Sequence, residues 1–320
     1  MKKPNNAIHK LANELFQFAK SDFHPFTYFY TLIFIFVCIF LNYSTGFYVT
    51  VMRESYFNNS SLWAFPLFYG VTYYSVAIPV LLFQKDFKTL KNGLFYLKSS
   101  FFILLYGLAV GYYGYRNWEF ASLFNTELQY LYRILSQLKG CVFFIIPLII
   151  IKKLFDKKIV GLYGLASNPK HISGYLLLFS FLLPFLVFVS FTPDFLNAYP
   201  QYRPWQYEVI FGLPTWVSTL IFEVSYSMDF VMTELIFRGA LVIGMISILG
   251  RNGVLPMVAM YAAIHFGKPL GETISSVAGG YILGALAYQT RHIWGGVIVH
   301  ICVALTMEIM GYIHFYILKN

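Results

Sequence analysis

Long apolar runs recur along almost the whole chain, and they constrain its fold more than any other feature. A helix that crosses the hydrocarbon core of a bilayer needs ~20 mainly apolar residues. Only 12% of the residues are charged, about half of what a soluble domain carries. We therefore predict an all-α, polytopic membrane protein. The candidate spans are roughly 27–46, 63–84, 97–115, 138–155, 174–193, 210–248, 253–267, 273–290 and 293–317.

Two of these runs decide the number of crossings. The run at 210–248 is too long for one simple crossing and has Gly212 and Pro214 near its start, which indicates a broken or strongly tilted helix. The run at 253–267 is short for a full crossing. We expect eight or nine transmembrane helices.

The N-terminal segment has a different pattern, because its apolar residues recur at helical spacing. Ile8, Leu11, Leu15 and Phe18 share one face, and polar residues occupy most of the other. This pattern predicts an amphipathic helix at the membrane interface, with a frayed N-terminus as the alternative. The first strongly apolar run begins only near Tyr28, so no cleavable signal peptide is expected.

The loop charges predict the orientation. Lysines cluster before the first span, after the second and after the fourth, and this alternation places the N-terminus in the cytoplasm. High Phe and Tyr content is compatible with a multi-pass protein of the bacterial inner membrane. The net charge of +9 is spread over loops without a long basic run, so no nucleic-acid partner is expected. The lysines are Lys2, Lys3, Lys10, Lys20; Lys85, Lys88, Lys91, Lys98; and Lys152, Lys153, Lys157, Lys158.

Ionisable residues divide the chain into regions. We predict an N-terminal amphipathic interfacial helix at 1–25, transmembrane helices with few internal charges at 26–208, and a core that carries the chemistry at 209–320. An ionised side chain at mid-membrane costs at least ~2.5–3.5 kcal/mol and usually faces a protein interior or a watery cavity. Those inside the last region are Glu223, Asp229, Glu234, Arg238, His265, Glu272, His300 and Glu308.

The strongest candidates for a site are Glu234, Arg238, His265 and His300. Glu234 and Arg238 stand four residues apart and can meet on one helical face, where an ion pair that pins two helices would be the structural explanation. With the two histidines added, a Glu beside a His can deprotonate a water, and a second His can stabilise an oxyanion. Glu234, His265 and His300 could equally hold a zinc ion with one open position.

The stretches "TELIFRG", "YAAIHFGKP" and "WGGVIVH" resemble, in order and approximate spacing, the motifs of the CAAX-protease and bacteriocin-processing (CPBP) family of intramembrane proteases. That family shows E-E-x-x-x-R, then F-x-x-x-H, then H-x-x-x-N or H-x-x-x-D, and the resemblance covers roughly residues 210–315. It implies an intramembrane endopeptidase that acts on a membrane-associated peptide or on the tail of a lipidated protein.

The resemblance also implies roles for single residues. Glu234 matches the second Glu of the pair, Arg238 the motif Arg, His265 the first His and His300 the second. A Glu and the first His would activate water, and the second His would steady the tetrahedral intermediate. The resemblance leaves a glutamic and a metal-dependent mechanism open, so no cofactor is certain and zinc remains a candidate.

Three positions depart from the family pattern. Thr233 stands where the family has its first Glu, Ala304 where it has Asn or Asp, and Tyr261 where it has Phe. Either Glu234 is then the base, or another group has replaced the missing one, or the protein no longer cleaves peptides.

Two carboxylates have the helical phase to be such replacements. Asp229 lies one turn before Thr233, and Glu308 lies two turns after His300. An interfacial or ion-paired carboxylate is the alternative for both.

Three functions therefore follow from the residues. The first is an intramembrane endopeptidase, whose Glu234, His265 and His300 should line one cavity that opens toward the cytoplasmic half of the membrane. The second is a catalytically silent scaffold or immunity-type protein. The third is a transporter, which the absence of symmetric halves in the sequence disfavours.

Overall fold

The computed structural model describes residues 5–118, 120, 122–165, 169, 171–207 and 209–318. This part of the chain is built from helices without a β-strand, so the predicted all-α polytopic membrane fold is confirmed. The main helices are α1 (Asn5–Asp22), α2 (Pro25–Thr45), α3 (Ser61–Phe83), α5 (Gly93–Gly111), α6 (Asn125–Phe155), α7 (Ile172–Val189), α9 (Thr215–Glu234), α11 (Val254–Ala263), α12 (Leu270–Thr290) and α13 (Trp294–Ile313). Shorter ones are α4 (Phe87–Leu90), α8 (Pro193–Ala198) and α10 (Ile246–Leu249).

Seven helical segments of the described residues are long and apolar enough to cross a membrane. The runs expected at 210–248 and 253–267 fall within one of them, Thr215–Ala263. The run expected at 273–290 forms α12, which has the length of a span but is not one of the seven. Its Gly, Ser and Thr residues lower its hydropathy, and this together with the joining of the two runs gives seven such segments where eight or nine spans were expected.

The expected break in the long run lies near its end and not near its start. Helix α9 begins directly after Pro214 and continues into the π-helical segment η5 (Leu235–Ile243). The chain then turns at Gly250, whose φ of 56° is in the left-handed region that favours glycine. Every residue of η5 and of α11 is buried, so these two segments form the centre of the molecule.

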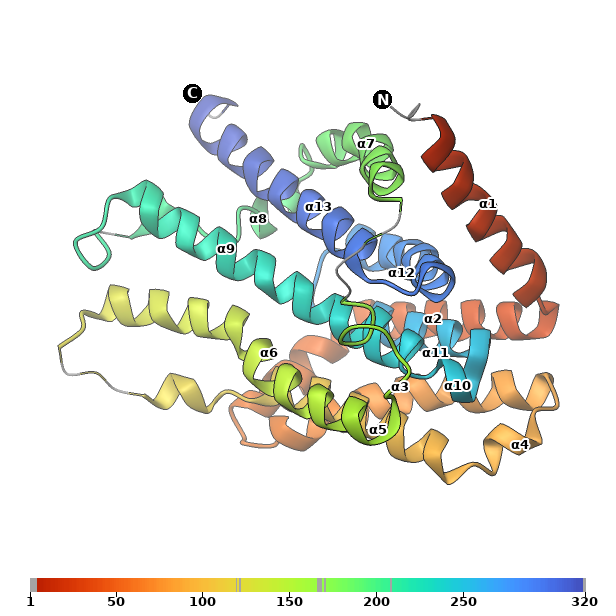
Figure 1. The fold of residues 1–320 in the computed structure, drawn as a ribbon. Helices are drawn as coiled ribbons and strands as arrows, with labels where there is room; N and C mark the ends of the chain where they lie inside the picture. The colour runs from red at the N-terminus through yellow and green to blue at the C-terminus, as the bar shows by residue number, and fades with distance from the viewer. Residues whose placement is uncertain are drawn as a thin grey trace.

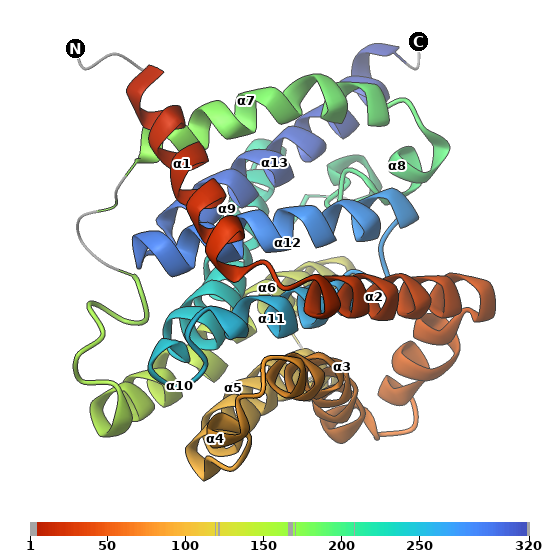
Figure 2. The same ribbon diagram turned by 90° about the vertical axis from the view of Figure 1, so that its right-hand side faces the viewer.

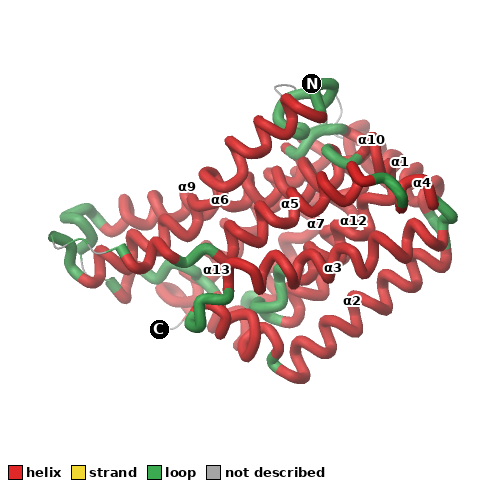
Figure 3. The backbone as a smooth tube through the Cα atoms, turned by 90° about the horizontal axis from the view of Figure 1, so that it is seen from below, coloured by secondary structure: helices red, strands yellow, loops and turns green. Residues whose placement is uncertain are grey.

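The other helices surround this centre. In Figure 2, α7, α12 and α13 lie above α10 and α11, and α3, α4 and α5 lie below them. Helix α11 packs against α12, α3 and α2, and η5 packs against α12 and α5. Figure 3, the view from below, shows the helices in red as one bundle, with the connections between them in green.

The N-terminal segment forms a helix, as its pattern predicts. Leu11 and Phe18 are buried, and the Phe18 ring meets Tyr281 and Tyr288 of α12 edge-on. Figure 1 shows α1 in red along the flank of the bundle, and its neighbours are α7 and α12. Its placement at a membrane interface and the division into three regions remain predictions.

One lysine that was assigned to a loop is buried inside a helix. Lys98 lies in α5 with only 2% of its surface exposed. Its Nζ lies 2.7 Å from Asp156 Oδ1 and donates to the Gly244 carbonyl at 2.6 Å, while the Tyr163 hydroxyl donates to Asp156 Oδ2 at 2.8 Å. The region 26–208 thus holds a buried ion pair, which ties α5 to the end of α6 and to the turn after η5.

Candidate functional site

The ion pair expected between Glu234 and Arg238 is present where α9 passes into η5. Arg238 Nη1 lies 2.9 Å from Glu234 Oε1, and both residues are fully buried. The contact has the distance of an ion pair without the directed geometry of a hydrogen bond. π-Helical turns inside α-helices are frequent at functional sites, because they change which side chains face a neighbour.

His300 of α13 is the next member of this cluster. Its Nδ1 lies 2.8 Å from Glu234 Oε1. Gly296, one turn before His300, allows this approach, because a Cβ at that position would lie 2.1 Å from Glu234 Oε2. The second glycine in "WGGVIVH", Gly296, is therefore required by the contact between α13 and the Glu234 carboxylate.

Tyr261 of α11 completes the cluster. Its hydroxyl lies 2.5 Å from His300 Nε2, and Arg238 Cζ lies 4.1 Å from the centre of its ring. Both ring nitrogens of His300 are therefore in contact with protein groups. The result is a continuous chain of polar groups from Arg238 through Glu234 and His300 to the Tyr261 hydroxyl.

His265 follows α11 in the turn that leads to α12. Its Nδ1–H donates to the Tyr261 carbonyl at 2.8 Å, and its own carbonyl accepts a hydrogen bond from Thr273 at 2.6 Å. Its ring packs edge-on against the Tyr261 ring at 4.8 Å. Because Nδ1 carries the proton, Nε2 of the neutral ring is a hydrogen-bond acceptor.

Tyr261, His265 and His300 border a cavity of about 480 Å³ among α7, α9, α11, α12 and α13. A cavity of this size is typical of ligand sites in proteins. One wall is apolar, with leucines of α7 such as Leu178 and Leu182. The polar lining residues include Asp229, Thr233, Tyr261, His265, Lys268, Glu272, Ser275, Ser276 and His300.

The structure brings most of the predicted site together, with one change of position. His265, His300, Thr233 and Asp229 line the cavity, but Glu234 and Arg238 lie behind its wall. The expectation that Glu234 would line the cavity is wrong, because Arg238, His300 and Gly296 enclose its carboxylate. Arg238 has the expected position one turn after Glu234.

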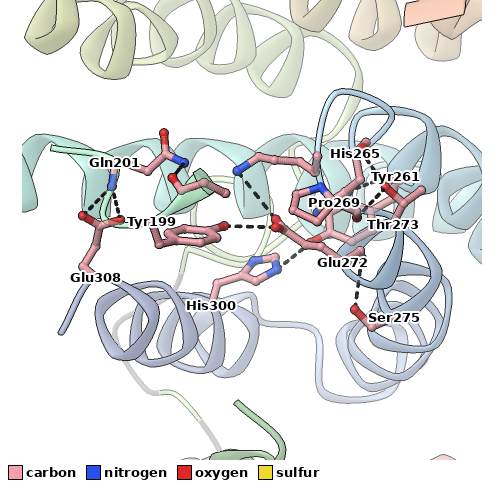
Figure 4. Close-up of polar contacts among 12 residues, drawn as sticks. Tyr199, Gln201, Tyr261, His265, Pro269, Glu272, Thr273, Ser275, His300 and Glu308 are labelled. Atoms are coloured by element: carbon pink, nitrogen blue, oxygen red, sulfur yellow. Dashed lines mark hydrogen bonds and ion pairs between the residues drawn. The ribbon is translucent and has the colours of Figure 1, made fainter. Parts of the chain in front are cut away.

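Glu308 does not face the cavity as expected. Both of its carboxylate oxygens accept from the backbone N–H of Gln201, at 2.8 and 2.9 Å. Figure 4 shows this pair to one side of His300, with the Glu308 carboxylate directed at Gln201. His300 and Glu308 lie two turns apart on the same face of α13, but their surroundings differ. His300 lines the cavity, whereas the connection after α8 covers Glu308.

Glu272 is the lining carboxylate that the sequence did not single out. It lies in the first turn of α12, accepts from the Tyr199 hydroxyl at 3.0 Å, and has Lys268 Nζ at 3.6 Å (Figure 4). The sequence showed it only as one ionisable residue among eight. Nothing in its local pattern marks a link to Tyr199, which is 73 residues away.

The zinc set that the sequence left open does not fit the geometry. The described part of the chain places no group of three or more His, Cys, Asp or Glu side chains so that it could hold a metal ion. Both nitrogens of His300 face Glu234 and Tyr261, and Glu234 is paired with Arg238. We therefore derive no step through a metal.

Fold and site together define a class: an integral, multi-pass α-helical membrane protein with a buried Glu–Arg–His cluster beside a cavity. Residues 203–306 match the family model described as "Type II CAAX prenyl endopeptidase Rce1-like", and this segment contains all the motif residues. This segment is therefore similar to the CAAX-protease family, and the resemblance drawn from the motifs is confirmed for residues 203–306. No curated protein and no solved structure matches the chain.

Proposed function

We propose that this protein is an intramembrane endopeptidase that hydrolyses a peptide bond of a membrane-associated substrate in the 480 Å³ cavity. The observation that carries the proposal is that His265 and the Tyr261–His300 pair border one cavity, within a segment that matches a family of CAAX-type proteases. The match supports a protease in general, and the geometry supports the roles below.

His265 is the group that we assign to water activation. Its Nδ1–H is held by the Tyr261 carbonyl, which leaves Nε2 to accept a proton from a water in the cavity. A positioned histidine is the most frequent general base in enzymes. Thr233 cannot take this role, because a hydroxyl is not a base near neutral pH.

We assign the oxyanion to the hydroxyl of Tyr261. When His300 carries a proton on each ring nitrogen, its Nδ1 forms an ion pair with Glu234 at 2.8 Å and its Nε2 can donate to the Tyr261 oxygen. The Tyr261 O–H is then free to donate into the cavity, where it would stabilise the tetrahedral intermediate. Glu234 supports the protonated imidazole, and Arg238 holds Glu234 in place.

The lining of the cavity supports a substrate with apolar character. Leu178, Leu182 and Phe185 of α7 line the cavity together with polar groups of α11 and α12. A membrane-bound peptide or a lipidated protein tail fits a cavity with both apolar and polar lining residues. The lipid bilayer is the other partner in this proposal. We keep the cytoplasmic N-terminus, the cytoplasmic opening of the cavity and the bacterial inner membrane as parts of this proposal.

The test is cleavage of membrane-anchored peptides by the purified protein in proteoliposomes, with new peptide termini identified by mass spectrometry. We expect His265→Ala to abolish cleavage. His314→Ala is the matched control, because His314 contacts Ser190 at 3.0 Å and does not line the cavity. Equal cleavage by wild type and His265→Ala would refute the assigned base.

A second candidate is a catalytically silent protein that binds the same kind of membrane peptide. The specific observation in its favour is that Thr233 and Ala304 both line the cavity, at the positions where the family has a carboxylate and an amide or carboxylate. It predicts that a photo-crosslinkable membrane peptide labels the cavity of the wild type while no new terminus forms.

A further inference from the structure

A second cavity, of about 730 Å³, lies apart from the proposed catalytic one and shares no lining residue with it. Three connections and Tyr288 of α12 form it: the connections are the α1–α2 junction, the end of α3 with the residues after it, and the turn between α10 and α11. Figure 1 shows these connections at the same right-hand end of the bundle, near α4 and α10. The lining residues are Ser21, Asp22, Phe23, His24, Phe83, Gln84, Lys85, Leu249, Gly250, Arg251, Asn252 and Tyr288.

Two cationic side chains line this cavity. Arg251 comes from the turn before α11, and its Nη1 donates to the Ser21 carbonyl, which holds the guanidinium at the α1–α2 junction. Lys85 comes from the connection that follows α3. A guanidinium and an ammonium on separate connections can contact one phosphate from two sides.

The same cavity has acceptors whose hydrogen bonding is incomplete. Asp22 is 6% exposed; its Oδ2 accepts from Tyr28 at 2.7 Å, and its Oδ1 has no hydrogen-bond partner among the residues that the structure describes. Asn252 Oδ1 is buried and equally unpartnered within the described chain. Burial raises the pKa of the Asp22 carboxyl, and Arg251 opposes that rise. Buried acceptors of this kind favour a ligand that brings a hydrogen-bond donor.

The position of the cavity matches the level of lipid headgroups. It lies where two candidate spans end, at Pro25 and at Phe83. Phe23 and Phe26 are 62% and 68% exposed, and the Phe26 ring stacks on Phe83 at 6.3 Å. Exposed aromatic rings next to cationic side chains are typical of the membrane–water boundary.

We propose that this cavity binds the headgroup of an aminophospholipid. The phosphate contacts Lys85 and Arg251, and the ammonium group donates to Asp22 and Asn252. An ethanolamine headgroup has both parts. A choline headgroup has the same phosphate and the same charge but no N–H, so it cannot satisfy the two acceptors.

The test is titration of the purified full-length protein in detergent with phosphatidylethanolamine and phosphatidylcholine of identical chains, with bound lipid counted by native mass spectrometry. We expect one tightly bound phosphatidylethanolamine, with about tenfold weaker binding of phosphatidylcholine. The double variant Lys85→Gln with Arg251→Gln should lose both lipids. Lys91→Gln is the matched control, because Lys91 is exposed in the following connection and does not line the cavity.

Asn252→Ala should remove much of the preference for ethanolamine while phosphate binding persists, and Asp22→Asn is the second variant with the same expected result. Equal affinity of the wild type for the two lipids would overturn the proposal. An equal loss of lipid binding in the Lys91→Gln control and in the double variant would overturn it as well. Soluble glycerophosphoethanolamine is the last arm. If it displaces the lipid at equal concentration, the assignment to a membrane lipid is wrong and a soluble phosphate compound is the ligand.

Discussion

Two buried ion pairs allow a direct comparison between the N-terminal helices and the C-terminal core. Lys98–Asp156 has an N–O distance of 2.7 Å and Arg238–Glu234 one of 2.9 Å, and the side chains of both pairs are at most 4% exposed. Their surroundings differ. The first pair ends on Tyr163 and on a backbone carbonyl, whereas the second continues through His300 and Tyr261 to the wall of a cavity.

Burial of charge is therefore not by itself a sign of function in this protein. Both pairs meet the need to neutralise charge in an apolar interior, and either would look like a functional group in the sequence. What separates them is access: the first pair is closed by its own hydrogen bonds, and the second leads to the wall of a cavity. Substitutions in the two clusters should therefore differ in their effect on cleavage.

Removing the cation from either ion pair should destabilise the protein by a similar amount. Lys98→Ala and Arg238→Ala each remove the permanent cation beside a buried carboxylate, and we expect a loss of about 3–5 kcal/mol in the free energy of unfolding. Denaturant unfolding in micelles measures it, with Lys91→Ala as the exposed control. A stability close to wild type in either variant would show that the pair is not closed to water.

Loss of a tyrosine hydroxyl should reduce cleavage in the Glu234 cluster and only stability in the Lys98 cluster. Tyr261→Phe restores the residue of the family pattern and removes the proposed oxyanion donor, so we expect cleavage to fall about 10²–10³-fold. Tyr163→Phe removes the equivalent hydroxyl from the Lys98 cluster and should lower stability by about 1 kcal/mol without a direct effect on cleavage. Turnover by Tyr261→Phe at or above the wild-type rate would mean that His300 contacts the substrate itself.

Two glycines allow the same comparison without a change of charge. A Cβ at Gly296 would lie 2.1 Å from Glu234 Oε2, so Gly296→Ala should cost about 1–3 kcal/mol of stability and also reduce cleavage. A Cβ at Gly244 would meet the Ala240 carbonyl at 2.4 Å and the Tyr163 ring at 2.9 Å, so Gly244→Ala should affect stability alone. Gly70→Ala, with nothing within 4 Å, is the control for the substitution itself. If cleavage by Gly296→Ala is unchanged, the contact between Glu234 and His300 is not needed for catalysis.

The smallest effects concern the two cavity positions that depart from the family. Thr233→Glu places a carboxylate in the cavity, and we expect cleavage to rise at least about tenfold if a second base is useful. Ala304→Asn alone should change little and should help only together with Thr233→Glu, because an extra oxyanion donor matters once water attacks efficiently. Cleavage rates of the wild type, both single variants and the double variant decide this. A double variant no faster than wild type would favour the silent binding protein.

Features that depend on local geometry could be predicted from the residues alone. Apolar runs fixed where helices form, since each must satisfy its own backbone within the bilayer. The four-residue spacing of Glu234 and Arg238 fixed their contact, because residues one turn apart on a helix are neighbours. The spacing of Leu11 and Phe18 fixed the buried face of α1 in the same way. Motif order alone was sufficient to predict the similarity of residues 203–306 to CAAX-type proteases.

Only the tertiary structure decided which of these groups reach the cavity. Glu234 lies behind the wall because α13 approaches it closely at Gly296, and Lys98 is buried because a segment 58 residues away supplies Asp156. Glu308 has the helical phase of His300, yet the backbone of Gln201 covers it. Such contacts depend on how helices rotate and pack against segments that are distant in sequence, and no local spacing encodes that rotation.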